Sequence, residues 1–139
     1  MNNSITKKEV KNYSRDFRTI ANRTLNSDFD DFDDNLKRLI YHIDNNSIIS
    51  EFINSCTTEE DSFDIKNDIE QVSNGYGEYY FDSFIEDEKE VTYTYQILKY
   101  ITENNINFRS YVYPYSTSNK YQDKVKGFNE KLFYHLLML

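Results

Sequence analysis

Residues 86–104 read EDEKEVTYTYQILKYITEN, and this stretch decides the expected fold. At the helical increment of about 100° per residue, its apolar and tyrosine side chains cover roughly 220° of the circumference. These side chains are Val91, Tyr93, Tyr95, Ile97, Leu98, Tyr100 and Ile101. The polar side keeps only Thr92, Gln96, Lys99 and Glu103. A helix that is apolar over more than half of its circumference packs against neighbours on two sides, so we expect a buried central helix here.

Five further segments carry the pattern of amphipathic helices. Apolar residues recur at i, i+3 and i+4 in 6–25, 29–45, 47–55, 62–73 and 122–139. Glycine and proline are scarce, with Gly 3 and Pro 1, whereas a sandwich or barrel of short strands needs more turn residues. The sequence therefore predicts an all-α, single-domain bundle of about five or six helices around the central one.

Composition narrows the classes of function. The chain of 139 residues has the length of one domain, and its formal net charge is −8. Surfaces of DNA, RNA and anionic lipid attract Lys and Arg, so direct binding of the whole domain to nucleic acid or membrane is not expected. No stretch of about 18 apolar residues and no apolar signal-peptide core occurs in the sequence, which favours a cytoplasmic location.

Two features could carry metal or thiol chemistry, and each has a simpler structural interpretation. Cys56 is the only cysteine, which excludes an intrachain disulfide and a Cys-rich zinc site, and a single buried thiol is usually an apolar filler. The acidic run from Asp28 to Asp34 lacks the mid-loop glycine of an EF-hand. Its carboxylates also complement the dipole at a helix start. We expect no catalytic residue, cofactor or metal, with a cation at the acidic run left open.

Arg38 and His42 share the expected helix 29–45. Their order is similar to the motif of small helical RNases, in which four to six residues separate an Arg from a His, although only three separate them here. A helical RNase therefore stays an alternative. The simpler interpretation places His42 at the edge of an apolar helix face. No Ser/His/Asp motif, phosphate-binding loop or deaminase signature is present.

Residues 104–121 form the one long irregular stretch between expected helices. The alternation in 108–115 could form a short strand, although a lone hairpin is marginal. Long loops of compact domains are often functional, and Tyr and Arg are frequent in interface hot spots. The candidate contact residues are Arg109, Tyr111, Tyr113 and Tyr115. Packing of the tyrosines over the helices is the simpler alternative.

The expected last helix is apolar to its end. It closes on His135-Leu136-Leu137-Met138-Leu139 without a capping residue, glycine or charge. Natural helices usually carry a stop signal, so we expect the chain to be the N-terminal part of a longer protein, or this helix end to be buried in an oligomer. Leu132, Leu136 and Leu139 are the corresponding candidate interaction residues.

Three runs of the chain carry a resemblance to known sequences. They are FDDNLKRLIYHID at 32–44, YTYQILKYITENN at 93–105 and SNKYQDKVKGFNEKL at 118–132. Together they resemble the N-terminal helical domain of an uncharacterised family of proteins from low-GC Gram-positive bacteria. The resemblance implies a helical fold that continues into a different C-terminal region, and it brings no catalytic residues. It also implies a loose association with phage-defence or mobile-element contexts.

These observations leave three hypotheses for the function. The leading one is a non-enzymatic protein–protein interaction or assembly module of a cytoplasmic bacterial protein, which binds a protein partner or a second copy through its C-terminal helix and tyrosine-rich stretch. The second is an acidic inhibitor that mimics nucleic acid and occupies the basic groove of a nuclease or repressor, because Asp and Glu concentrate in the middle of the chain. The third is the helical RNase.

Overall fold

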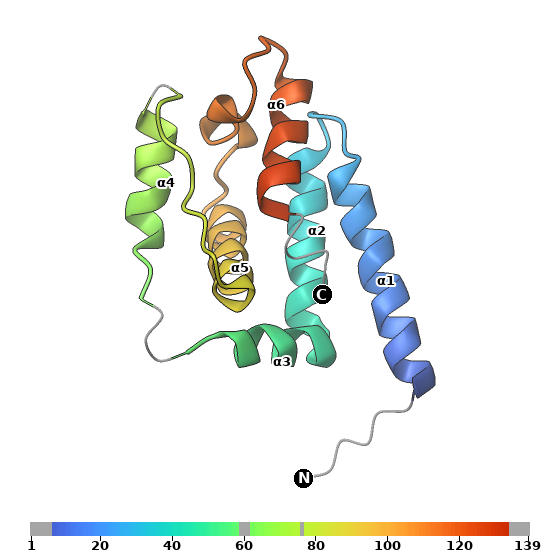
Figure 1. Cartoon of the computed structure of the whole chain (residues 1–139). Coiled ribbons are helices and arrows are strands. Elements are labelled where there is room, and N and C mark those ends of the chain that lie inside the picture. Colours follow the sequence, from blue (N-terminus) through green and yellow to red (C-terminus); the bar gives the residue numbers. More distant parts are fainter. Residues whose placement is uncertain (1–6, 59–61, 76, 134–139) are drawn as a thin grey trace.

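A computed structural model describes residues 7–58, 62–75 and 77–133 of the chain. These residues form an all-α bundle without strands (Figure 1). The helices are α1 (Lys7–Leu25), α2 (Phe32–Asn45), α3 (Ser47–Cys56), α4 (Ile65–Asn74), α5 (Asp87–Glu103) and α6 (Tyr121–Phe128). The all-α fold class is therefore confirmed. None of the described helices is long and apolar enough to cross a membrane.

Helix α5 occupies the centre of the bundle, as its apolar circumference predicts. It contacts α2, α3 and α4, while α1 packs against α2 on the outer side (Figure 1). Ile97 and Leu98 are both fully buried in the core. Packing on more than one side is the arrangement expected for a helix with so wide an apolar face.

The polar side of α5 is narrower than the sequence indicates. Thr92 was expected to face solvent, but it is buried at 1% exposure. Its hydroxyl forms a hydrogen bond of 3.2 Å with the Thr57 hydroxyl just beyond α3. A buried hydroxyl costs little free energy when it has a partner, so α5 can bury threonine where periodicity alone suggests exposure.

Helix α2 begins three residues later than its apolar pattern suggests. Asp31 donates its backbone N–H to the Asp28 carbonyl at 3.0 Å, which closes a turn ahead of the helix. The backbone N–H of Phe29 is bound by the side-chain oxygen of Gln122 at 2.8 Å. Phe29 thus lies in the turn ahead of the helix, tied to the start of α6, and its ring packs against the core.

The segment between α5 and α6 is helical in short pieces. The strand considered for 108–115 is wrong, because this region forms two 3₁₀ turns, η1 (Phe108–Ser110) and η2 (Tyr113–Tyr115). The Asn107 side chain caps η1 by accepting the Arg109 N–H at 2.9 Å. Local capping therefore satisfies backbone groups that have no partner strand in the described part of the chain.

The expected helix 122–139 is not a continuous α-helix in its described part. Helix α6 gives way to a π-helical turn, η3 (Asn129–Phe133). Gly127 explains how closely this helix approaches the preceding loop, because a Cβ atom built on it would lie 2.1 Å from the Tyr115 carbonyl oxygen. Phe128 is fully buried, with its ring against Phe32, Phe81, Tyr111 and Tyr115. Helix α6 is thus a core element.

Candidate functional site

Two neighbouring hollows lie where the segment after α4 meets the loop before α6. The first, of about 290 Å³, is lined by Val72, Ser73, Gly77, Arg109, Ser110 and Tyr113. The second, of about 310 Å³, is lined by Tyr80, Pro114, Tyr115, Ser116, Thr117 and Lys131. Consecutive residues of the η2 turn line both hollows, with Tyr113 in the first and Pro114 and Tyr115 in the second. We call the two hollows and their lining residues the tyrosine surface.

Two tyrosines of this surface are open to solvent. Tyr113 is 52% exposed and Tyr80 is 56% exposed. The Tyr80 ring stands edge-on to Tyr115, with 5.3 Å between the ring centroids and 90° between the planes. Large aromatic side chains that remain half-exposed offer contact area to a partner at a small cost in side-chain entropy.

Lys124 of α6 holds the turn that carries Tyr113. Its ammonium group donates to the carbonyl of Tyr113 at 3.0 Å and to that of Ser116 at 2.7 Å. The same nitrogen lies 4.2 Å from the centroid of the Tyr113 ring. Although Lys124 is only 5% exposed, these contacts compensate its burial and fix both backbone and ring in place.

The Tyr115 side chain lines the second hollow and contacts Phe128 of the core. Its hydroxyl accepts the backbone N–H of Phe81 at 3.1 Å, which joins η2 to the segment after α4. Burial raises the pKa of Tyr115 above its ordinary value. The side chain therefore stays neutral and braces the second hollow.

Arg109 lines the first hollow, and two aromatic rings support its guanidinium group. Its guanidinium carbon lies 4.8 Å from the ring centroid of Phe108 and 5.5 Å from that of Tyr121. Stacking on two rings restricts the side chain and leaves the edges of the guanidinium group for hydrogen bonds. Within the described part of the chain, Arg109 forms no ion pair.

The structure separates the seven candidate interaction residues into three groups. Arg109, Tyr113 and Tyr115 line the tyrosine surface. Tyr111 and Leu132 are buried, at 0% and 7% exposure, and belong to the core. Burial also raises the pKa of Tyr111 well above its ordinary value, and its hydroxyl has no partner among the described residues. Leu136 and Leu139 lie outside the described residues.

Sequence reasoning missed several members of the surface. Gly77, Tyr80 and Lys131 line it, yet they come from segments far from Arg109 in the sequence. Gly77 has a positive φ of 84° and approaches the ring of Tyr113 so closely that a Cβ atom would lie 2.9 Å from it. The run Glu78-Tyr79-Tyr80 after two glycines was the available signal, because tyrosines in an irregular segment are presented to solvent or to a neighbouring loop.

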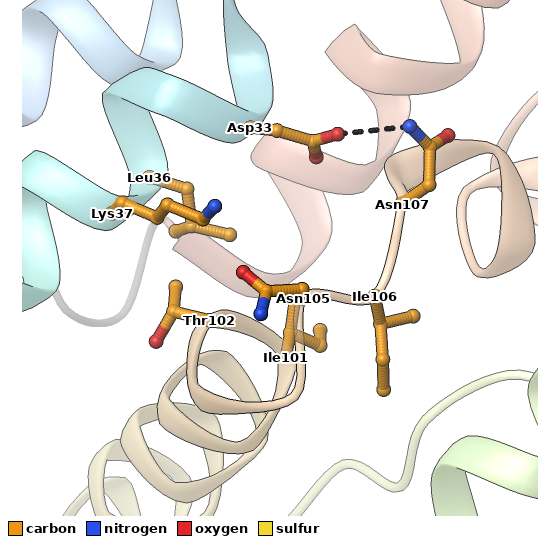
Figure 2. Close-up of a pocket in the computed structure, with 8 residues that line it drawn as sticks. All are labelled: Asp33, Leu36, Lys37, Ile101, Thr102, Asn105, Ile106 and Asn107. Carbon is orange, nitrogen blue, oxygen red and sulfur yellow. Dashed lines mark hydrogen bonds between the residues drawn. The ribbon is translucent and has the colours of Figure 1, made fainter.

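A smaller pocket of about 70 Å³ lies between α2 and the end of α5 (Figure 2). At its rim, the carboxylate of Asp33 accepts the Phe108 N–H at 3.2 Å and the Asn107 side-chain amide at 3.1 Å. Burial raises the pKa of Asp33, and the hydrogen bond from Phe108 opposes that rise. Asp33 therefore ties the loop before α6 to α2. Within the described ranges, no three His, Cys, Asp or Glu side chains are grouped to hold a metal ion.

The proposed RNase pair sits in a packing environment. The ring of His42 stacks on Phe17 of α1, with 6.4 Å between centroids and 8° between planes. Its Nε2 atom is buried and lacks a hydrogen-bond partner among the described residues. Arg38 is exposed. A catalytic imidazole needs both an accessible nitrogen and a positioned proton acceptor, so the geometry favours a packing role for His42.

Cys56 shows the features of a structural thiol. It is 3% exposed, and burial is the main cause that raises its pKa. Reactive cysteines require the opposite shift, because the thiolate is the nucleophile. The prediction of an apolar filler thus agrees with its environment.

Comparison of the chain with protein-family models, with curated proteins and with solved structures found no match.

Proposed function

We propose that this protein is a non-enzymatic protein–protein interaction module and that it binds its partner through the tyrosine surface. The observation that carries the proposal is the pair of hollows with half-exposed Tyr80 and Tyr113 at their rims. Tyr and Arg are the residue types that most often dominate the free energy of protein association. Both types meet here, on residues distant in the sequence.

Rigidity of the surface supports the proposal. Binding orders side chains and loops at an entropic cost, and a surface that is already fixed avoids much of that cost. Lys124 fixes the Tyr113 turn, and Tyr115 ties that turn to Phe81. A loop that only covers the core does not need to hold a tyrosine ring at the rim of a hollow. The contacts of Lys124 and Tyr115 hold such a ring in place.

Leu132 of the expected C-terminal helix is not part of the proposed binding surface in this conformation. Leu132 packs into the core of its own chain, so its side chain is not free to join a second copy in this conformation. Self-association through Leu136 and Leu139 stays a prediction. The same holds for the role in a cytoplasmic bacterial phage-defence or mobile-element protein.

Capture experiments with matched variants test the proposal. The immobilised chain, the Tyr80→Ala/Tyr113→Ala double variant and a Tyr41→Ala control would each be exposed to lysate of the source organism, and retained proteins would be quantified by mass spectrometry. Tyr41 is 71% exposed on α2 and lines neither hollow. We expect at least about a tenfold loss of a retained partner for the double variant alone. Equal retention by all three proteins would refute the proposal.

The acidic inhibitor is the second candidate, and one observation favours it. Asp28, Asp30, Asp31 and Asp34 are all exposed around the start of α2, whereas Asp33 turns toward η1. Such a carboxylate array would attract a basic nuclease or repressor with strong salt dependence. A basic protein whose retention falls for Asp30→Asn/Asp31→Asn/Asp34→Asn, and not for the tyrosine double variant, would favour this candidate over the first.

A further inference from the structure

We infer that the tyrosine surface recognises an acidic, extended segment of a partner protein. The inference rests on the proposed function and names the chemistry of its partner. Each of the two hollows is lined by one cationic residue beside tyrosine, with Arg109 in the first and Lys131 in the second. Neither cation forms an ion pair within the described residues.

The first hollow offers a matched set of donors for a carboxylate. The planar guanidinium group of Arg109 can bind both oxygens of a carboxylate through two parallel N–H donors. Ser73 and Ser110 line the same hollow. The neighbouring carboxyl of Asp33 already accepts hydrogen bonds from Phe108 and Asn107. Two aromatic rings hold the guanidinium group of Arg109. Burial raises the pKa of Asp33, and the charge of Arg109 acts to lower it without a close ion pair between them.

The second hollow repeats this chemistry in a weaker form. Lys131 is exposed, and the half-exposed Tyr80 supplies aromatic contact area. The buried ammonium group of Lys124 lies 4.2 Å from the centroid of the Tyr113 ring. Three positive charges thus surround the η2 turn.

The charge of the whole molecule makes this local pattern selective. With a net charge of −8, the protein as a whole repels acidic partners. Complementary charge fixes the register of a partner and excludes wrong ones, even where it adds modest affinity. Two hollows lined by consecutive residues of one turn suit an extended peptide, whose alternate side chains point to the same side, better than a single small ligand.

Selection from a random peptide library displayed on phage tests the inference, with the full chain as bait. We expect enrichment of peptides with Asp or Glu beside an aromatic or apolar residue. Synthetic copies would then be titrated against the wild type and against Arg109→Gln, Lys131→Gln and an Arg38→Gln control, which changes an exposed Arg outside both hollows. Binding should weaken about five- to tenfold for Arg109→Gln and less than about twofold for Arg38→Gln.

The outcomes separate this inference from the proposed function. Peptides that lose affinity when their Asp and Glu are replaced by Asn and Gln, and that depend on Arg109, support both. Neutral or basic peptides that still require Tyr80 and Tyr113 would overturn the acidic partner and leave the interaction module standing. A selection in which no enriched peptide depends on Tyr80 or Tyr113 would overturn both.

Discussion

Lys124 illustrates how one buried charge can shape a surface. Its ammonium group has no carboxylate partner among the described residues and is instead held by two backbone carbonyls and one aromatic face. Hydrogen bonds to a charged donor are stronger than neutral ones, so the lysine can fix the Tyr113 turn from beneath. The periodicity of the sequence does not show that Lys124 is buried. Lys126, the other lysine of the same helix, is exposed.

Replacement of Lys124 by Met should loosen the tyrosine surface. Methionine keeps most of the apolar stem but leaves the carbonyls of Tyr113 and Ser116 without their donor. We expect the free energy of unfolding to fall by about 1–3 kcal/mol, measured by urea denaturation. Lys126 lies two residues after Lys124 in the same helix and is exposed. Lys126→Met is therefore the matched control and should change the free energy of unfolding by less than about 0.5 kcal/mol. Equal stability of the two variants would show that the clamp does not form.

The helices differ in how accurately the sequence predicts their bounds and their buried residues. Helix α5 was predicted within a residue or two at each end, because its apolar residues face neighbours on several sides and its pattern is long. Helix α2 starts late because a turn from Asp28 to Asp31 precedes it, and Phe29 in this turn is bound by Gln122, 93 positions away. Thr92 is buried because Thr57 happens to face it. Long-range partners of this kind leave no trace in local periodicity.

The tyrosine surface was only partly predictable for the same reason. Arg109, Tyr113 and Tyr115 follow from the composition of one irregular stretch. Their neighbours Gly77, Tyr80 and Lys131 come from two other segments, and only tertiary packing brings them together. Tyr111 has the same residue type and spacing as Tyr113, but the 3₁₀ turn at η1 directs it into the core.

A polar contact between α2 and α5 gives a pH-dependent test of their packing. Asp44 of α2 accepts hydrogen bonds from Lys99, at 2.7 Å, and from the Tyr95 hydroxyl. The hydrogen bond to Asp44 raises the pKa of Lys99 from 10.5 to about 12. Because the folded pKa lies above the unfolded one, the contact stabilises the fold below the unfolded pKa and is lost as pH rises through the folded pKa.

Asp44→Asn should therefore return the pKa of Lys99 toward its ordinary value. The shift can be followed by NMR titration of the lysine side-chain signals. Glu103→Gln is the control, since that carboxylate lies 3.9 Å from the Lys99 nitrogen and should affect the pKa less. An unchanged Lys99 pKa in Asp44→Asn would mean that the two helices do not meet at this contact.

At the scale of the whole molecule, the proposed recognition surface lies mainly on the loops of the bundle. Helix α5 is enclosed by α2, α3 and α4, and α6 contributes Phe128 to the same core. The segment after α4 runs beside the loop before α6 (Figure 1), and residues of both line the two hollows. A rigid helical core that positions irregular segments is a common way to build a binding site.

Hydrogen–deuterium exchange of the chain alone and with its captured partner tests the central claim most directly. We expect slower exchange on binding in residues 77–81 and 109–117, with no change in α3, which lies away from both hollows. Bound segments are protected because the partner excludes water and stabilises their hydrogen bonds. Protection confined to α1, to the start of α2 or to α3, with 77–81 and 109–117 unchanged, would contradict the account.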